Sequence, residues 1–250
     1  MNPAPPVTKR RRGEFDFDFS IEFIIDLDTV ITNEDSLARQ NSRPFLSPAP
    51  IRKIAVIVPV YNGTDVFKKL VSSLARTYAE PTPGIQFFFF DDASTDPLLF
   101  SLYDDPFFRR ADVQLHRQKV NLGFIGAVNS SVRLCPADAD LVLLNSDTQV
   151  WTRSFEKLQE VALRHPSVAS VTPLTNQGTI ASLFHWPAGL DTEPYFTPQE
   201  IAETVEKSAI ESPYFPAPTG VGFCMYISRA AWNLVGEFSD AFGKGYGDRK

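Results

Sequence analysis

The sequence predicts an α/β fold, an open mixed and mostly parallel sheet flanked by helices, with an N-terminal β-strand extension. Short apolar runs alternate with amphipathic segments of helical length along most of the chain, and this alternation is typical of βα units. The runs are continuous and rich in branched or aromatic residues, as in strands buried on both faces of a parallel sheet. An alternating apolar and polar segment precedes them, which indicates a half-buried strand.

The N-terminal part has three predicted pieces. Residues 1–13 are proline-rich and contain a basic run, so we expect a disordered tail. From residue 14, Phe and Ile alternate with polar residues, which predicts a strand that either joins the edge of the main sheet or comes from a small β module. Prolines mark residues 41–50 as a linker. We therefore assign residues 14–50 to an extension and residues 51–250 to the main domain.

The main domain begins with a predicted strand over residues 54–58, a turn over 59–63 and a helix over 65–76. The pattern continues with strands expected at 85–90, 113–117, 141–144 and 168–172, and helices at 123–134 and 155–164. In the less regular second half we expect a helix over 198–210, a strand over 220–227 and a helix over 229–235. Polar clusters follow several strands directly, at the carboxyl ends where open α/β sheets bind ligands.

Composition narrows the function classes. A chain of 250 residues with 43% hydrophobic residues can bury a substantial core. The net charge of −6 argues against general nucleic-acid binding, which needs a clustered positive field. The two cysteines have no metal-site spacing, and no apolar run approaches the ~18 residues of a membrane helix. We expect a cytoplasmic protein that acts on small molecules, with peripheral association at the inner face of the membrane left open.

Two carboxylates, Asp91 and Asp92, come directly after four consecutive phenylalanines. Carboxylates at a strand's carboxyl end can accept hydrogen bonds from a base imide or from ribose hydroxyls, which suits a neutral, donor-rich nucleoside. The alternative is that Asp92 only caps the next turn. These two residues are nucleoside-binding candidates.

The next buried run ends on Asn145, Ser146 and Asp147. A divalent cation bound to a diphosphate takes one or two protein carboxylates, and its other ligands are phosphate oxygens and water. Asp147 suits that role for Mg²⁺ or Mn²⁺, and the alternative is that it starts an ordinary turn.

Between these clusters, Asn121 precedes Gly123 and Gly126 at a helix start. Glycines let a backbone approach a ligand, and amides at a helix start favour anionic groups. The segment has neither the dinucleotide-binding nor the P-loop pattern, so a Rossmann site and a P-loop kinase are not supported.

Taken in order, five motifs resemble those of family 2 glycosyltransferases, in particular a rhamnosyltransferase-like subgroup, over residues 51–248. They are Pro59-Val-Tyr-Asn62, Phe90-Asp-Asp-Ala-Ser-Thr-Asp96, Asn121-Leu-Gly-Phe-Ile-Gly-Ala-Val-Asn129, Leu143-Leu-Asn-Ser-Asp147 and Gly220-Val-Gly-Phe-Cys-Met225. The resemblance implies a GT-A fold and an inverting transfer from a dTDP- or UDP-linked sugar to a glycan, lipid-linked glycan or other hydroxyl acceptor. It also implies use of Mg²⁺ or Mn²⁺.

By the same resemblance, the donor-binding residues are Pro59, Tyr61, Asn62, Asp91, Asp92, Asn121, Gly123, Asn145 and Ser146. Asp147 matches the last carboxylate of the family's DXD motif, whose first position is Asn145 here. Asp248, after a Gly-Tyr-Gly turn, matches the first acid of the general-base motif. Arg249 and Lys250 follow instead of the family's second acid, so the domain is truncated there or the base lies elsewhere.

Two other interpretations stay open. The first is a catalytically impaired module that binds nucleotide sugars or serves as a scaffold in a larger, multidomain glycosyltransferase. The second, weaker one is a sugar-phosphate nucleotidyltransferase, which needs a Gly-rich, Arg-bearing loop after its first strand. Residues 58–63 contain no such loop.

Overall fold

We describe the protein from a computed structural model, which places residues 22–26, 52–165, 167–175, 197, 199–200, 202–203, 214–217, 219–239 and 241. Among these residues, no helix is both long and apolar enough to cross a membrane. Most of the predicted helix over 198–210 and the candidate base Asp248 lie outside the described residues.

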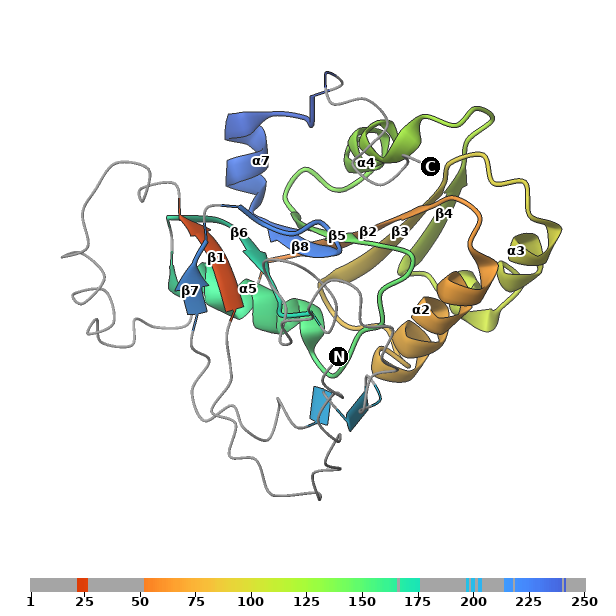
Figure 1. Cartoon of the computed structure of the whole chain (residues 1–250), viewed down its shortest axis with the longest axis horizontal. Helices are drawn as coiled ribbons and strands as arrows, with labels where there is room; N and C mark the ends of the chain where they lie inside the picture. The colour runs from red at the N-terminus through yellow and green to blue at the C-terminus, as the bar shows by residue number, and fades with distance from the viewer. Residues whose placement is uncertain are drawn as a thin grey trace, which may run out of the picture.

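One sheet of eight strands organises these residues, in the order β4-β3-β2-β5-β8-β6-β1-β7 (Figure 1). Its parallel half consists of β4 (Val113–Arg117), β3 (Ile85–Asp91), β2 (Ile54–Val60) and β5 (Asp140–Leu144). The strand β8 (Cys224–Ile227) is antiparallel to both β5 and β6 (Val168–Thr172). The predicted open mixed, mostly parallel sheet is confirmed.

The alternating N-terminal segment contributes strand β1 (Glu22–Asp26), which joins the main sheet. It runs antiparallel to β6 and parallel to β7 (Tyr214–Pro216), a strand that we did not predict. Because β7 lies outside it, β1 is an inner strand of the main sheet, and neither of the two predicted alternatives, an edge strand or a separate β module, describes it.

Helices cover both faces of the sheet (Figure 1). On one face α2 (Thr64–Thr77) and α5 (Ser154–Arg164) bury apolar side chains against Phe87 and Phe89. On the other, α4 (Gly123–Val132) and α7 (Arg229–Val235) pack with Phe88. Successive strand residues point to opposite faces, so the consecutive phenylalanines contribute side chains to the core on both faces of the sheet.

Two short helices were missed by our sequence prediction. They are α3 (Pro97–Leu102) and the 3₁₀ turn η3 (Pro106–Arg109). Asp96 and Asp105 accept hydrogen bonds from the second residue of each, at 2.9 Å, and proline follows each aspartate. Aspartate as N-cap with proline at the first helical position is a helix-start signal that the sequence does contain.

The end of β2 differs from the prediction, because the strand continues through Pro59 to Val60. The Val60 carbonyl accepts from the Asp92 amide at 2.8 Å, so it points toward β3. The nitrogen of Pro59, one residue earlier, therefore points to the other side, where the described pairing with β5 ends at Ile57. A proline without an N–H is tolerated there because no ladder bond needs it.

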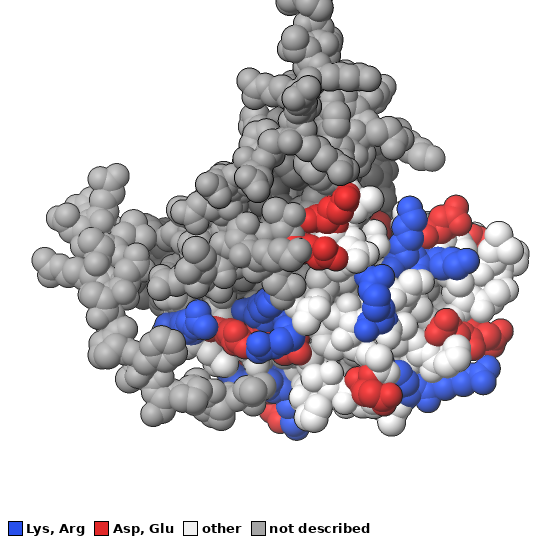
Figure 2. Space-filling model, turned by 90° about the horizontal axis from the view of Figure 1, so that it is seen from below, with Lys and Arg blue, Asp and Glu red and all other residues white. Residues whose placement is uncertain are grey.

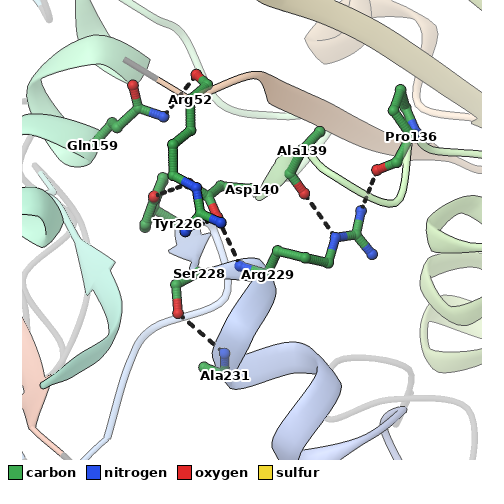
Figure 3. Close-up of polar contacts among 9 residues, drawn as sticks. All are labelled: Arg52, Pro136, Ala139, Asp140, Gln159, Tyr226, Ser228, Arg229 and Ala231. Carbon is green, nitrogen blue, oxygen red and sulfur yellow. Dashed lines mark hydrogen bonds and ion pairs between the residues drawn. The ribbon is translucent and has the colours of Figure 1, made fainter. Parts of the chain in front are cut away.

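A buried polar network ties the last elements to the amino-terminal end of β5 (Figure 3). Asp140, which is 0% exposed, accepts from the Tyr226 hydroxyl at 2.6 Å and from the Arg229 amide at 2.7 Å. The Arg229 guanidinium donates to two carbonyls of the loop before β5. The Arg52 guanidinium lies 3.7 Å from the Asp140 carboxylate. Burial, followed by the bond to Asp140, raises the pKa of Tyr226. This network fixes β8 and α7 to the parallel half of the sheet.

Figure 2 shows the molecule from below the view of Figure 1, with acidic and basic side chains interspersed over the described part of that face. Interspersed charges of both signs are the pattern of an ordinary solvated surface.

Candidate active site

The predicted donor-site residues gather at one edge of the sheet. Parallel pairing of β2 with β3 and with β5 brings the carboxyl ends of these strands together. The chain leaves β2 toward β3 and β4, then crosses back to β5 on the other side of β2. The strand order therefore reverses between β2 and β5, and open α/β sheets bind ligands at this switch point.

Asn62 links two of the loops at this edge. Its amide donates to Ser94 Oγ at 2.9 Å, and its side-chain oxygen accepts from the amides of Thr95 and Asp96, at 2.9 and 3.1 Å. The residue adopts a left-handed conformation with φ of 54°, which asparagine tolerates better than most residues. Asn62 thus serves as a loop clamp.

This clamp leads to a prediction for two variants. Asn62→Gly keeps the left-handed backbone but loses both side-chain hydrogen bonds, so we expect the free energy of unfolding to fall by about 1–2 kcal/mol. Asn62→Ala adds the cost of a left-handed alanine, about 1 kcal/mol more. Urea denaturation checks both values, and equal losses in the two variants would contradict the conformational part of the argument.

Asp92 fixes the start of α4. It is 3% exposed, and its two oxygens accept from the amides of Leu122 and Gly123 at 2.7 and 2.8 Å. Asn121 adds a bond from its side-chain amide to the Asp92 carbonyl at 3.2 Å. Gly123 has φ of 72°, which favours glycine at this turn. We expected the amides of this helix start to be free for an anionic ligand, but two of them already bind the protein's own carboxylate.

Asp91 is 0% exposed and holds a residue that we did not predict, Arg117. One Asp91 oxygen accepts from the Ser94 amide at 2.7 Å, and the other lies 3.2 Å from Arg117 Nε. Arg117 also donates to the Ser94 carbonyl at 2.9 Å and stacks on Phe100, with 4.0 Å from its central carbon to the ring centroid. Its side chain is 51% exposed. Asp91 therefore orients a half-exposed guanidinium at the candidate site.

The buried hydroxyl of Tyr103 belongs to the same group. Burial, followed by the negative charge of Asp91, raises the pKa of Tyr103, so this hydroxyl stays protonated. Arg117 could have been recognised from the sequence as a candidate. It ends β4 as Asp91 ends β3, and the two residues lie opposite each other in the sheet.

The turn after β5 lies on the other side of the switch point. The Asn145 amide and the Thr148 hydroxyl both donate to the Phe223 carbonyl, at 2.8 and 3.2 Å. Asn145 and Ser146 are half-buried, whereas Asp147 is exposed. Within the described part of the chain, Asp147 has no hydrogen bond or ion pair. Its carboxylate is thus open to a ligand, unlike those of Asp91 and Asp92.

Of the remaining candidates, Tyr61 is 54% exposed beside the clamp, and Pro59 is half-buried at the end of β2. Cys224 begins β8 next to Phe223, and burial raises the pKa of its thiol to about 12. A thiol with this pKa is protonated at neutral pH and is not a nucleophile.

The carboxylate of Asp96 makes the stability of the fold depend on pH in the acid range. The hydroxyl of Thr64 and then the amide of Leu98 donate to its carboxylate, which lowers the pKa of Asp96 below its ordinary 3.8. A depressed carboxylate pKa stabilises the fold above the unfolded-state value, and this contribution is lost as pH falls through the folded-state pKa. We expect the melting temperature of Asp96→Asn to lie below that of the wild type at neutral pH, and the difference to shrink as pH falls below the ordinary pKa of aspartate. A constant gap across that range would contradict this assignment.

Comparison of the sequence with models of protein families shows which family the chain belongs to. A model described as glycosyl transferase family 2 matches residues 55–232, which is more than half of the chain. The chain belongs to glycosyl transferase family 2. The match includes every predicted site residue except Asp248. A search of curated proteins finds no significant match.

Two solved structures are similar to this family 2 glycosyltransferase, and the first of them supports its fold. A mannosyltransferase, PcManGT from Pyrobaculum calidifontis, solved with GDP-Man and Mn²⁺, is 16% identical with a TM-score of 0.50, and the match covers 82% of this chain and 53% of that one. TarS 1-349 from S. aureus, solved with UDP-GlcNAc, is 22% identical with a TM-score of 0.39, covering 46% and 32%. This chain thus spans about half the length of PcManGT, and the likeness to PcManGT confirms the GT-A type of fold.

The described residues could supply only a minority of the ligands of a divalent cation. In the ranges given above, no group of three or more His, Cys, Asp and Glu side chains could hold a metal. Asp147 is an exposed carboxylate, and a hard cation such as Mg²⁺ or Mn²⁺ usually takes only one or two protein carboxylates when it binds a diphosphate. A metal that arrives with the donor diphosphate fits this site.

Proposed function

We propose that this family 2 glycosyltransferase transfers a sugar, with inversion, from a dTDP- or UDP-linked donor to a glycan, lipid-linked glycan or other hydroxyl acceptor, in polysaccharide or cell-surface glycan assembly. The observation that carries the proposal is a contrast between two groups of residues at the carboxyl ends of the strands, one held by internal hydrogen bonds and one exposed. Asp91, Asp92 and Asn62 are committed to scaffold bonds, while Tyr61, Arg117 and Asp147 present exposed groups around the switch point.

These exposed groups suit the parts of a nucleotide sugar. The ring of Tyr61 offers a stacking surface for a base, and the Arg117 guanidinium offers donors to base or ribose oxygens. Asp147 would hold the cation, which supplies Lewis-acid stabilisation of the leaving diphosphate when bound. By the motif resemblance, Asp248 would take the proton from the acceptor hydroxyl. The rhamnosyltransferase-like subgroup remains our proposal for the donor class.

A turnover assay tests this function. The chain is incubated with UDP-, dTDP- and GDP-linked sugars, with Mn²⁺ or with EDTA, and release of the nucleoside diphosphate is measured with and without candidate acceptors. Metal-dependent release from one donor class is the expected result. Release from no donor in any condition, despite nucleotide binding, would favour the impaired binding module instead.

A further inference from the structure

The loop before β8 lies beside the turn that carries the candidate metal ligand Asp147. The antiparallel contact of β5 with β8 continues past the strands, because the Asn145 amide donates to the Phe223 carbonyl at 2.8 Å. The Thr148 hydroxyl donates to the same carbonyl at 3.2 Å. Gly222 immediately precedes Phe223, with about 3.8 Å between their Cα atoms. Gly222 is therefore a neighbour of the Asp147 turn.

The first of two glycines in this loop is explained by the packing of the protein itself. A Cβ atom on Gly220 would stand 3.2 Å from Met225 Cε and 3.2 Å from Thr172 Oγ1, which is tighter than side chains normally pack. Thr172 Oγ1 also accepts a hydrogen bond from the Val221 amide at 3.2 Å. The lack of a side chain at Gly220 thus lets this loop pack against the end of β6.

The second glycine, Gly222, has no such explanation. A Cβ atom on this residue would meet no atom of the described residues within 4 Å, although the residue is half-buried. Its φ lies outside the left-handed region, so the backbone does not require glycine. Glycine costs more conformational entropy on folding than any other residue. Neither packing nor φ accounts for this glycine, and the space beside it is open.

The sugar of the donor suits this space by its covalent position. In a nucleoside diphosphate sugar the sugar is bonded to the second phosphate, and a cation held by Asp147 would contact that diphosphate. The sugar ring then lies beside the Asp147 turn, where Gly222 leaves room. Close approach of a backbone to a ligand is one of the uses of glycine.

We propose that Gly222 is a specificity-determining residue, which leaves room for the sugar ring of the donor. The nucleoside and the cation are assigned to other residues, Tyr61, Arg117 and Asp147. A side chain at position 222 would therefore obstruct the sugar and spare the nucleotide. The inference rests on the proposed function, because it needs the donor diphosphate at Asp147.

The test compares Gly222→Ala and Gly222→Val with Ala79→Val. The control adds apolar bulk at an exposed position between α2 and β3, at the opposite end of the sheet. Calorimetry with Mn²⁺ gives the Kd for UDP, dTDP and GDP, and for UDP-glucose, UDP-GlcNAc, dTDP-rhamnose and GDP-mannose. Thermal unfolding gives the melting temperature of each variant, and all titrations are made below it. Binding is measured without turnover, so an inactive chain can also be tested.

We expect Gly222→Val to weaken binding of the nucleotide sugar at least tenfold and Gly222→Ala to weaken it less. Both variants should keep the Kd of the matching nucleoside diphosphate within twofold, and Ala79→Val should change neither Kd. The melting temperature of Gly222→Ala should not fall below that of the wild type, because the added methyl group meets open space.

Three results would overturn the inference. They are unchanged affinity of Gly222→Val for the nucleotide sugar, an equal loss of affinity for the nucleotide sugar and the nucleoside diphosphate, and a lower melting temperature of Gly222→Ala, which would make this glycine structural. A wild-type chain that binds nucleoside diphosphates but none of the four nucleotide sugars also overturns it. A wild-type chain that binds no nucleotide refutes the proposed function itself.

Discussion

Asp140→Ala lowers the free energy of unfolding by about 3–5 kcal/mol, because removing one member of a buried charged network leaves its partners unpaired. The Tyr226 hydroxyl and the Arg229 amide both lose their acceptor, and both residues are buried. Domain stabilities are typically about 5–15 kcal/mol, so this is a large fraction of the total. Urea denaturation monitored by circular dichroism measures the loss.

Asp138→Ala is the matched control, because Asp138 pairs with Lys53 on the surface two residues away. We expect its denaturation midpoint to equal that of the wild type, since exposed ion pairs contribute little. Asp140 begins β5, opposite Ile54 at the start of β2 and therefore at the far end of the sheet from the candidate donor site. Any folded Asp140→Ala molecules should bind nucleotide with unchanged Kd, and equal stability of the two variants would contradict our description of the network.

Asp147→Asn reduces nucleoside diphosphate release about 100-fold or more, because the change removes the negative charge that would hold the cation at the leaving diphosphate. The side chain is exposed and makes no hydrogen bond or ion pair within the described residues, so we expect stability to change by less than about 0.5 kcal/mol. Steady-state assays across a range of Mn²⁺ concentrations measure the loss.

Glu80→Gln serves as the control for Asp147, since Glu80 is an exposed carboxylate in the loop before β3, at the opposite end of the sheet. It should keep full turnover. Wild-type turnover by Asp147→Asn at every Mn²⁺ concentration would exclude Asp147 as a metal ligand.

Three of the four parallel strands, β2, β3 and β5, could be predicted because they are short and mostly apolar runs, and residues 54–57, 85 and 87–90 are indeed buried. The strand order could not be predicted in the same way. Nothing in the residues of β8 indicates that this strand lies between β5 and β6 and is antiparallel to both. That arrangement depends on distant partners such as Tyr226 and Asp140, 86 residues apart.

The position of the candidate site was predictable for a similar reason, because polar residues that end parallel strands must share one edge. The roles within it were not. Asp91 and Asp92 look alike in the sequence, yet one faces Arg117 and the other faces the start of α4. Asn129 was visible as part of a motif, but Phe238, to which it is hydrogen-bonded, lies 109 residues later, so this contact becomes visible only in the fold.

The central claim is tested most directly by calorimetric titration of UDP, dTDP and GDP into the protein, with and without Mn²⁺, alongside the Asp147→Ala variant. Our account predicts metal-dependent binding of UDP or dTDP by the wild type and loss of that binding in the variant. Failure of all three nucleotides to bind, with Mn²⁺ present and the protein folded, would contradict it.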